Sequence, residues 1–508
     1  MILVLRLTLS LFLSRLLSQW SSHVRSRALL RTLRQILCLA PLLFLTINPV
    51  NANQNLPTFR DSTSGIISLE QERRLGQQFL RSIRAQAPTL DDPILQDYLE
   101  YLIYKLAANS QLDDRRIDLV LINNPTLNAF AAPGGIVGVH QGLFQHAQTE
   151  HEISAILSHE LAHLSQRHFA RRLAESKKNA AYNIAGLLAG IVLAATAGSE
   201  AGLAALTTSQ GIAQNQILQY SREREAEADR IGIYTLADAG MDPRAMAYMF
   251  ERLQQSSRYS TGNRIPEFLR THPVTTDRIA DSYNQARNYP KDTFPLSLGY
   301  QLMRARSRAL TTTNLTEEIA RSRDGASKGT EVSATASRYG LVLVLTRAME
   351  LDEARTELAT LKQAYPLNIP FQIAEANLYS RGEQSELALE VLKEALAVSP
   401  KNYPLSVAYA ETFLTNRKPH AALDVLIPLT LERPNDEYVW YLVAEAYGLA
   451  NNIPGVHEAR AEFFVLNGNF DQAIKQLGYA LPLVRQNFQQ SSRIKQRLED
   501  IWKLKDGS

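Results

Sequence analysis

The stretch SHELAHLSQRH, residues Ser158–His168, holds three histidines and one glutamate in an otherwise amphipathic helix pattern. It contains His159-Glu160-Leu161-Ala162-His163, which has the form His-Glu-x-x-His. Residues four apart share one face of a helix, so both imidazoles can reach one Zn²⁺. Glu160 lies one step round the helix, where it can touch water at the metal without binding the metal. The stretch therefore predicts a helix that holds a metal, and catalytic zinc needs a third protein ligand from elsewhere.

The better candidate for the third ligand lies in SREREAEAD, residues Ser221–Asp229. Glu225 and Asp229 stand four residues apart on a second predicted helix, so one carboxylate can bind zinc while the other accepts a hydrogen bond from a ligating imidazole. His168 is a poor candidate, because a third histidine close in sequence needs a glycine and a longer reach. The alternative is an exposed helix held by salt bridges, since four more charged residues share the stretch: Arg222, Glu223, Arg224 and Glu227.

These motifs resemble a known family. HELAH followed by Ser-Arg-x-x-Glu-x-x-Ala-Asp is similar to the zinc metallopeptidases that include the CAAX prenyl protease and the bacterial HtpX protease. The resemblance covers about residues 66–285. It implies one Zn²⁺ per chain, held by His159, His163 and Glu225, with Glu160 as the catalytic base. It also implies that Asp229 supports a ligating histidine.

Two further stretches extend the resemblance. The family's His-Pro followed five residues later by Arg is matched by His272-Pro273 and Arg278, and the resemblance places this His and Arg beside the zinc and the scissile carbonyl. LNAFAAPGG, which begins at Leu127, resembles the family's substrate edge strand, with Asn128 near the bound peptide. Pro273 suits the first turn of a helix, which predicts that His272 lies at a helix start. From there His272 could bind zinc as a fourth ligand or serve only the oxyanion.

The composition excludes several classes of protein and of metal site. The chain of 508 residues is too long for one core, so two or three folded units are expected. The net charge is +3, and six arginines among the first 35 residues have no acidic partner. The remainder is nearly balanced and lacks the dense basic stripe that nucleic acid requires, so no nucleic-acid partner is expected. The single cysteine, Cys38, excludes an internal disulfide and a cysteine-based zinc cluster.

The N-terminus reads as a secretory signal peptide with an N-terminal extension, residues 1–52. A basic flank precedes an apolar run from Ile36 to Leu45, and Val50-Asn51-Ala52 provides a small-residue cleavage site. The alternative is an uncleaved anchor, because the apolar run could extend to Val50.

Residues 179–199 carry no charge and read NAAYNIAGLLAGIVLAATAGS. Ala, Gly, Asn and Thr dilute this run, so a helical hairpin that is buried or touches a membrane peripherally is favoured, with residues 200–216 as its second arm. The alternative is a true membrane span, for which the length suffices.

The front of the chain predicts a catalytic domain over residues 53–289. Two helices with apolar periodicity are expected at residues 68–83 and 93–107. Three short β-rich runs follow, punctuated by Asn-Pro and Pro-Gly-Gly, at residues 116–123, 127–133 and 135–143. The stretch 290–331 is rich in Ser, Thr, Arg and Asn, and it reads as a linker containing one or two helices.

The tail repeats with a period of 34 residues, which is typical of tetratricopeptide repeats. Four columns keep the same register: Pro366, Pro400 and Pro434; Ala354, Ala388 and Ala422; Leu345, Tyr379, Phe413 and Tyr447; Val342, Ala376, Ala410 and Ala444. Residues 332–508 are therefore predicted to form stacked helix pairs with a concave binding surface. An unrelated helical bundle is the alternative.

The predicted fold is mainly α, with a zincin-like α+β metalloprotease domain that carries a small β-sheet, followed by an α-solenoid. A signal peptide, this domain and this tail together resemble periplasmic proteases of Gram-negative bacteria. The resemblance implies a periplasmic zinc endopeptidase, possible peripheral contact with a membrane, and two kinds of partner. These are unfolded or misassembled outer-membrane proteins and the β-barrel assembly machinery. The alternative function is a chaperone or scaffold with latent proteolytic activity.

Overall fold

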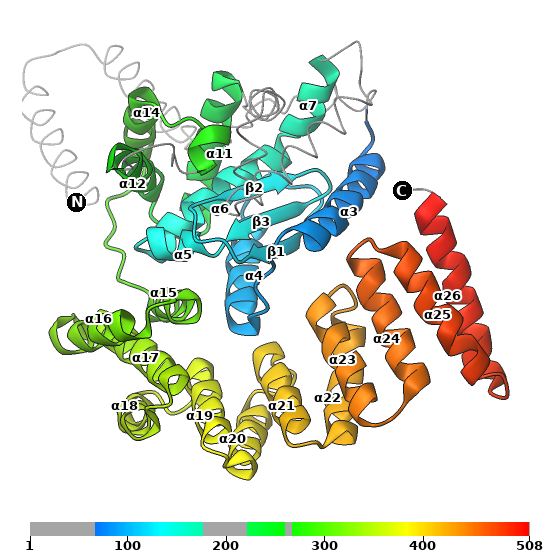
Figure 1. The fold of residues 1–508 in the computed structure, drawn as a ribbon. Helices are drawn as coiled ribbons and strands as arrows, with labels where there is room; N and C mark the ends of the chain where they lie inside the picture. The colour runs from blue at the N-terminus through cyan, green and yellow to red at the C-terminus, as the bar shows by residue number, and fades with distance from the viewer. Residues whose placement is uncertain (1–66, 176–220, 260–266, 507–508) are drawn as a thin grey trace, which may run out of the picture. The chain divides into compact units, whose positions relative to one another are not determined.

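A computed structural model describes residues 67–175, 221–259 and 267–506 of the chain (Figure 1). The predicted signal peptide and the uncharged segment 179–199 lie outside the described residues. The described residues all belong to one compact unit. Within the described ranges, no helix combines the length and the apolar character needed to cross a bilayer.

The two helices expected at the front of the chain are confirmed as α3 (Leu69–Gln86) and α4 (Pro93–Ala108). α3 begins with a capping box, in which the Ser68 hydroxyl accepts from the Gln71 backbone N–H and the Gln71 side chain accepts from the Ser68 N–H. α4 begins with proline after Asp92, whose carboxylate accepts from the Leu95 N–H. Each start is thus determined by local chemistry.

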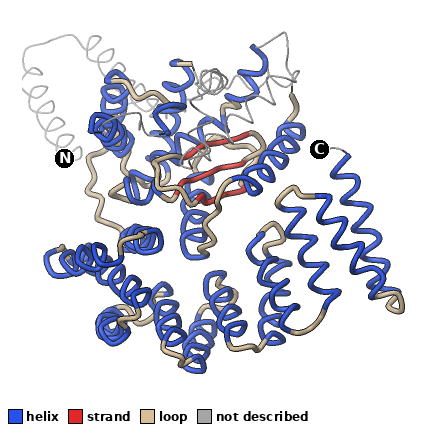
Figure 2. The backbone as a smooth tube through the Cα atoms, in the orientation of Figure 1, coloured by secondary structure: helices blue, strands red, loops and turns tan. Residues whose placement is uncertain are grey.

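The three β-rich runs form one sheet of β1 (Asp118–Ile122), β2 (Ala129–Ala132) and β3 (Ile136–His140), red in Figure 2. The strand order is β1-β3-β2, with β1 parallel and β2 antiparallel to β3. Gly134 and Gly135 form the turn between β2 and β3 at φ 74° and 84°, which side chains disfavour. β2 is therefore an edge strand of this sheet.

Helix α6 (Glu150–Ser165) is the centre of the front domain. Thr149 caps its first turn, and the helix packs against α4, β2, α11 (Arg222–Asp238) and α12 (Ala245–Tyr259). Nearly all of its residues are buried, so it is a core helix rather than a surface one. The remaining front helices are α5 (Gly142–His146), α7 (His168–Glu175), α13 (Glu267–Thr271) and α14 (Thr276–Ala286).

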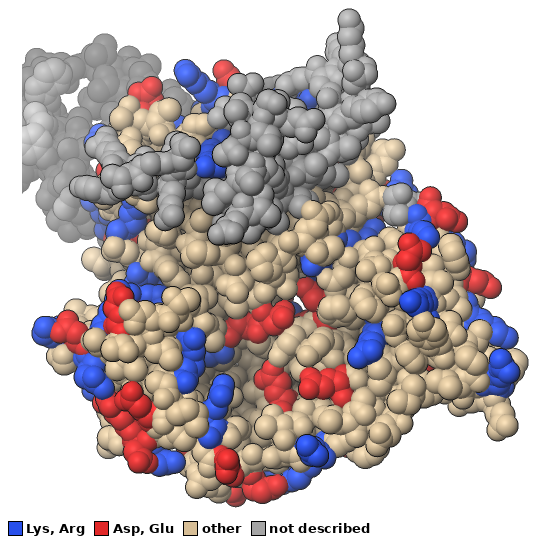
Figure 3. All heavy atoms as spheres, viewed as in Figure 1, with Lys and Arg blue, Asp and Glu red and all other residues tan. Residues whose placement is uncertain are grey.

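The tail is an α-solenoid in which successive helices pack against each other, and charges of both signs intermingle on the face seen in Figure 3. Ala354, Ala388 and Ala422 are each 0% exposed, as expected for a packing column. Its helices are α17 (Glu331–Ala348), α18 (Leu351–Ala364), α19 (Ile369–Arg381), α20 (Ser385–Val398), α21 (Tyr403–Thr415), α22 (Pro419–Glu432), α23 (Glu437–Leu449), α24 (Ile453–Leu466), α25 (Phe470–Leu483) and α26 (Phe488–Asp506).

A further column is visible only in the backbone. Met349, Glu383, Arg417 and Asn451 all have φ between 52° and 64°, and each closes the turn between the two helices of a repeat. They also lie 34 residues apart. The four side chains share no chemistry, so the sequence pattern does not reveal this column.

The expected linker is a packed part of the structure. It contains α15 (Leu298–Thr311) and α16 (Leu315–Lys328), and both pack against α17. α15 also contacts α4 and α5. Tyr300 is fully buried and stacks on Phe144, with ring centroids 6.2 Å apart. The helical stack therefore begins before the residue 332 boundary that the repeat pattern predicts.

Candidate metal centre

Two helices that lie side by side supply most of the site. α6 carries His159, Glu160 and His163, whereas α11 carries Glu225 and Asp229. The helices approach closely at Gly232 of α11, where a Cβ atom would lie 3.2 Å from the His159 backbone nitrogen. A residue without a side chain at this position thus lets α11 bring its carboxylates to the histidines.

Four side chains converge on one point: His159, His163, Glu225 and His272. The Nε2 atoms of His159 and His163 lie 3.1 Å apart, and Glu225 oxygens lie 3.6 Å and 3.5 Å from them. Zinc with bonds of about 2.0–2.1 Å places its tetrahedral ligands about 3.3 Å apart. All four residues are buried, and their donor atoms lie within 4.8 Å of one another. The donor types and spacing therefore fit a zinc ion.

His272 joins this group from the end of a helix, not from a helix start as expected. It follows the last residue of α13, while α14 begins only after the cap Thr275. Its N–H donates to the Phe268 carbonyl and its ring stacks on the Phe268 ring. Its Nδ1 lies 2.9 Å from Glu225 Oε1, and its Nε2 lies 3.5 Å from Glu160 Oε1. Pro273 thus ends α13 rather than starting α14.

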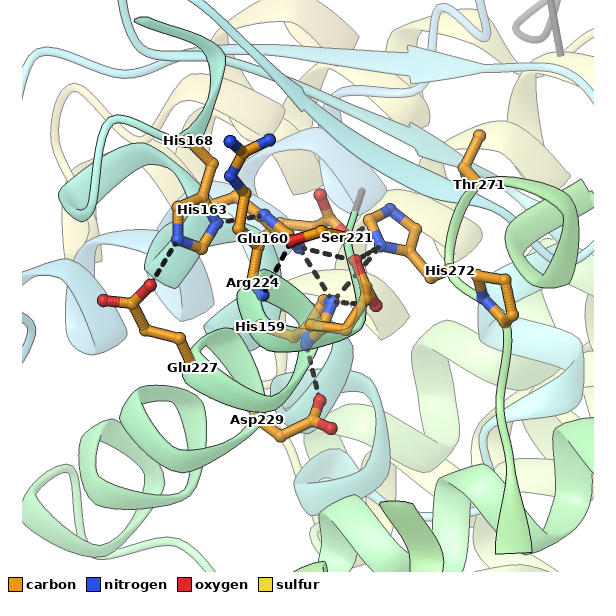
Figure 4. A network of polar contacts seen from close by, with 12 residues as sticks. His159, Glu160, His163, His168, Ser221, Arg224, Glu227, Asp229, Thr271 and His272 are labelled. Atoms are coloured by element: carbon orange, nitrogen blue, oxygen red, sulfur yellow. Dashed lines mark hydrogen bonds and ion pairs between the residues drawn. The ribbon is translucent and has the colours of Figure 1, made fainter. Parts of the chain in front are cut away.

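Asp229 and Arg278 form a charged group behind His159. The Asp229 Oδ1 atom lies 2.9 Å from His159 Nδ1 (Figure 4). Arg278 donates to both oxygens of Asp229 at 2.7 Å, and its Nη1 lies 2.9 Å from Glu225 Oε2. Nη1 also donates to the Pro273 carbonyl at 2.7 Å. The guanidinium therefore orients the carboxylates of α11, next to the candidate metal ligands.

The burial of these groups sets their protonation. Burial raises the pKa of Glu160, and this outweighs the lowering by His272 and His159. Burial also lowers the pKa of His163 well below its usual range. Burial works to raise the pKa of Glu225, but the charge of His272 and hydrogen bonds from His163 and His272 hold it well below normal. A neutral imidazole and an ionised carboxylate are the forms that bind a metal.

The edge strand β2 lies directly against α6. The His140 N–H donates to the Asn128 carbonyl, so the alternate residues Ala129 and Ala131 direct their backbone groups to the other edge. There the Ala131 N–H faces the Glu160 carboxylate and works to lower its pKa. The Asn128 side chain is 1% exposed, and its Oδ1 atom has no hydrogen-bond partner among the described residues.

Sequence reasoning set His168 aside, yet the structure places it beside the metal centre. Its Nδ1 atom lies 2.7 Å from His163 Nδ1, and its Nε2 lies 3.1 Å from Glu227 Oε2 (Figure 4). In the sequence His168 is a poor candidate for the third ligand and Glu227 is one of several charged residues in SREREAEAD, because no motif links a histidine five residues beyond His163 to a carboxylate on another helix. A buried histidine on the apolar side of α7 would have been the available signal.

Comparison with known proteins finds matches to both parts of the chain. Residues 93–284 match the model of peptidase family M48, and residues 383–446 match a tetratricopeptide repeat model. The chain is 32% identical over 451 residues to a β-barrel assembly-enhancing protease of Escherichia coli O157:H7, covering 89% of this chain and 92% of that protein. It is 34% identical over 454 residues to a putative β-barrel assembly-enhancing protease of Vibrio cholerae, covering 88% and 92%.

A more distant similarity covers the front domain alone. The mitochondrial metalloendopeptidase OMA1 of Schizosaccharomyces pombe is 30% identical over 220 residues, which is 42% of this chain and 60% of that protein. The fold and the buried donor group together define a metallopeptidase with a tetratricopeptide tail. The chain belongs to peptidase family M48.

Proposed function

We propose that this protein is a zinc-dependent endopeptidase of the periplasm, in which residues 53–289 cleave and the tail from residue 332 binds partners. The observation that carries the proposal is the convergence of His159, His163 and Glu225, with Glu160 beside them. These three residues would hold one Zn²⁺. Zinc, when bound, supplies a Lewis acid that polarises a carbonyl and acidifies water.

Glu160 is the proposed base. It takes a proton from the attacking water and returns it to the leaving amine, and its raised pKa brings it closer to the pH at which it works. Asp229 supports His159 from behind, and Arg278 positions Asp229 and Glu225. Because Arg278 is engaged there, His272 is the better candidate of the two for stabilising an oxyanion.

The substrate would bind as an extended strand along β2. Ala129 and Ala131 offer backbone groups to it, and the free Oδ1 of Asn128 can accept a hydrogen bond from it. Recognition through the backbone tolerates many sequences, which suits the removal of unfolded chains. A peptide paired with β2 would lie next to Glu160, since the Ala131 N–H faces that carboxylate.

The proposed clients are unfolded or misassembled outer-membrane proteins, and the proposed partner is the β-barrel assembly machinery. The names of the Escherichia coli and Vibrio cholerae relatives and the expected signal peptide support this assignment. The second candidate function is a scaffold with latent proteolysis. His272 favours it, because its Nδ1 atom lies among the donor atoms where it would complete the metal's coordination.

The test combines metal analysis with digestion of casein by the full mature chain. We expect one zinc per chain and hydrolysis that a chelator stops and added zinc restores. Glu160→Gln should retain zinc without hydrolysis, while Glu223→Gln, an exposed change of the same kind on α11, should leave both intact. Absence of zinc, or hydrolysis that persists with a chelator, would refute the proposal. Rescue of barrel assembly in cells by Glu160→Gln would favour the scaffold.

A further inference from the structure

We propose that His168 and Glu227 position His163 for metal binding, through a chain of hydrogen bonds that runs from the metal centre to Arg171. This inference rests on the proposed metal site, and it assigns roles to residues that do not bind the metal themselves. The two histidines of α6 would then have different supporting residues, because Asp229 contacts His159 directly.

The contacts form a continuous line. His163 Nδ1 lies 2.7 Å from His168 Nδ1, His168 Nε2 lies 3.1 Å from Glu227 Oε2, and the Arg171 Nη1 atom donates to the same oxygen at 2.8 Å. His168 is 0% exposed and His163 is 3% exposed. The His163–His168 contact is therefore shielded from water, which strengthens it, whereas Glu227 and Arg171 at the far end are partly exposed.

The direction of every hydrogen bond follows from one requirement. Nε2 of His163 faces Glu225 and His159, so metal binding through Nε2 places the ring proton on Nδ1. That N–H must then donate to His168 Nδ1, which leaves the His168 proton on Nε2, directed at Glu227. Arg171 donates to the same Glu227 oxygen at 2.8 Å, so the chain ends on a carboxylate paired with a cation.

The backbone conformation between α6 and α7 places His168 next to His163. Arg167, between α6 and α7, has φ 50°, a left-handed conformation that is unfavourable for any residue with a side chain. The Arg167 side chain holds the turn by donating to the Ile67 carbonyl at 2.7 Å and to Glu72 at 3.2 Å. The reversal brings His168 back against His163, five residues earlier in the chain.

Glu227 can support His163 only through His168. It stands two residues after Glu225 on α11, which turns its side chain by about 200° from that of the proposed ligand. Asp229, four residues after Glu225, is on the same face and reaches His159 directly. The two histidines of α6 thus share one supporting helix, but only His163 requires a second imidazole as a bridge.

The experiment measures zinc affinity of the full mature chain by competition with a chromophoric chelator, and the visible spectrum after cobalt substitution. His168→Leu removes the acceptor for the His163 N–H, and we expect a 10–100-fold loss of zinc affinity and an altered cobalt spectrum. His168→Gln can both accept and donate, so it should recover most of the affinity. Glu227→Gln should cause a smaller loss, since an amide oxygen still accepts but carries no charge.

The controls are His420→Leu and Glu223→Gln, which make the same changes at exposed positions. Urea unfolding of each metal-free variant shows whether a loss of affinity reflects a loss of folding. If wild type binds zinc and both His168→Leu and Glu227→Gln bind it equally well, the positioning role is wrong while the metal site stands. If His168→Gln binds zinc as weakly as His168→Leu does, the hydrogen-bond assignment is also wrong. Failure of wild type to bind zinc would instead refute the proposed function.

Discussion

Arg278 holds both carboxylate oxygens of Asp229 in a fork of two 2.7 Å hydrogen bonds, and Asp229 in turn lies 2.9 Å from His159. Replacing Arg278 by Ala would leave Asp229 buried without its cation, while Glu225 would keep its contact with His272. We expect a loss of about 3–5 kcal/mol in the unfolding free energy of the metal-free protein, because an unpaired buried charge is costly. Urea unfolding measures this loss, and Arg230→Ala on the exposed side of α11 is the control. If stability is unchanged and hydrolysis is lost, the role of Arg278 is instead to contact the scissile carbonyl.

Glu160→Gln and His163→Ala separate catalysis from metal binding. We expect Glu160→Gln to keep its zinc and to lose about 10²–10⁴-fold in hydrolysis, because an amide cannot accept the proton of water. His163→Ala should lose both zinc and hydrolysis, since it removes a ligand. Metal content and peptide cleavage, measured on the same samples, test the pair. Substantial activity in Glu160→Gln would show that another group acts as the base.

His272 has two possible roles, and the direction in which His272→Ala changes the rate of hydrolysis decides between them. Its Nδ1 atom lies 3.3 Å from His159 Nε2 and 2.9 Å from Glu225 Oε1, which is the position of a fourth ligand. We therefore expect His272→Ala to retain zinc and to increase casein hydrolysis, since a coordination position is opened. A decrease in the rate at full zinc content would instead show that His272 stabilises the oxyanion. An unchanged rate would exclude both roles.

Stability should fall in acid because of His140. Burial lowers the pKa of His140 to about 3, whereas an unfolded histidine titrates near about 6.5. Between these values the unfolded chain binds the extra proton, so acidification favours unfolding by up to about 1.4 kcal/mol per pH unit. Above about pH 6.5 the residue contributes no pH dependence.

Urea unfolding of full-length protein between about pH 7 and about pH 5 measures this slope. His140→Asn should reduce it, while the amide preserves a partner for the Thr126 hydroxyl, which lies 2.9 Å from His140 Nδ1. The exposed His420→Asn should leave the slope unchanged. A slope that survives His140→Asn in full would assign the acid sensitivity to other buried histidines.

The contact between α15 and α4 should be essential for folding of the whole chain. Arg306 donates to Asp92 at 2.7–3.0 Å, and both are buried. Arg306→Leu leaves Asp92 unpaired, and we expect a loss of about 3–5 kcal/mol in unfolding free energy. Adding Asp92→Asn should recover part of this loss, because the amide can still cap α4 without a charge. Arg323→Leu removes an exposed ion pair with Glu353 and should change stability little.

Much of this protein could be predicted from its sequence. The spacing of His159 and His163, the helix that carries Glu225 and Asp229, and the 34-residue columns each depend on local periodicity. A helix places residues four apart on one face whatever surrounds it. Apolar columns likewise identify repeated helix pairs, and the structure confirms the mainly helical architecture with its small sheet and solenoid.

The remaining features depended on tertiary structure, because they join residues that local periodicity does not connect. Arg278 pairs with Asp229 only because α14 packs against α11. His168 reaches His163 only because Arg167 reverses the chain, and Tyr300 is buried only because α15 packs on the front domain. Local sequence specifies the helices, the repeats and the candidate donor residues, since neighbouring residues encode them. Tertiary packing decided which charged and aromatic side chains meet, because a buried side chain can pair only with groups that the fold brings into contact with it.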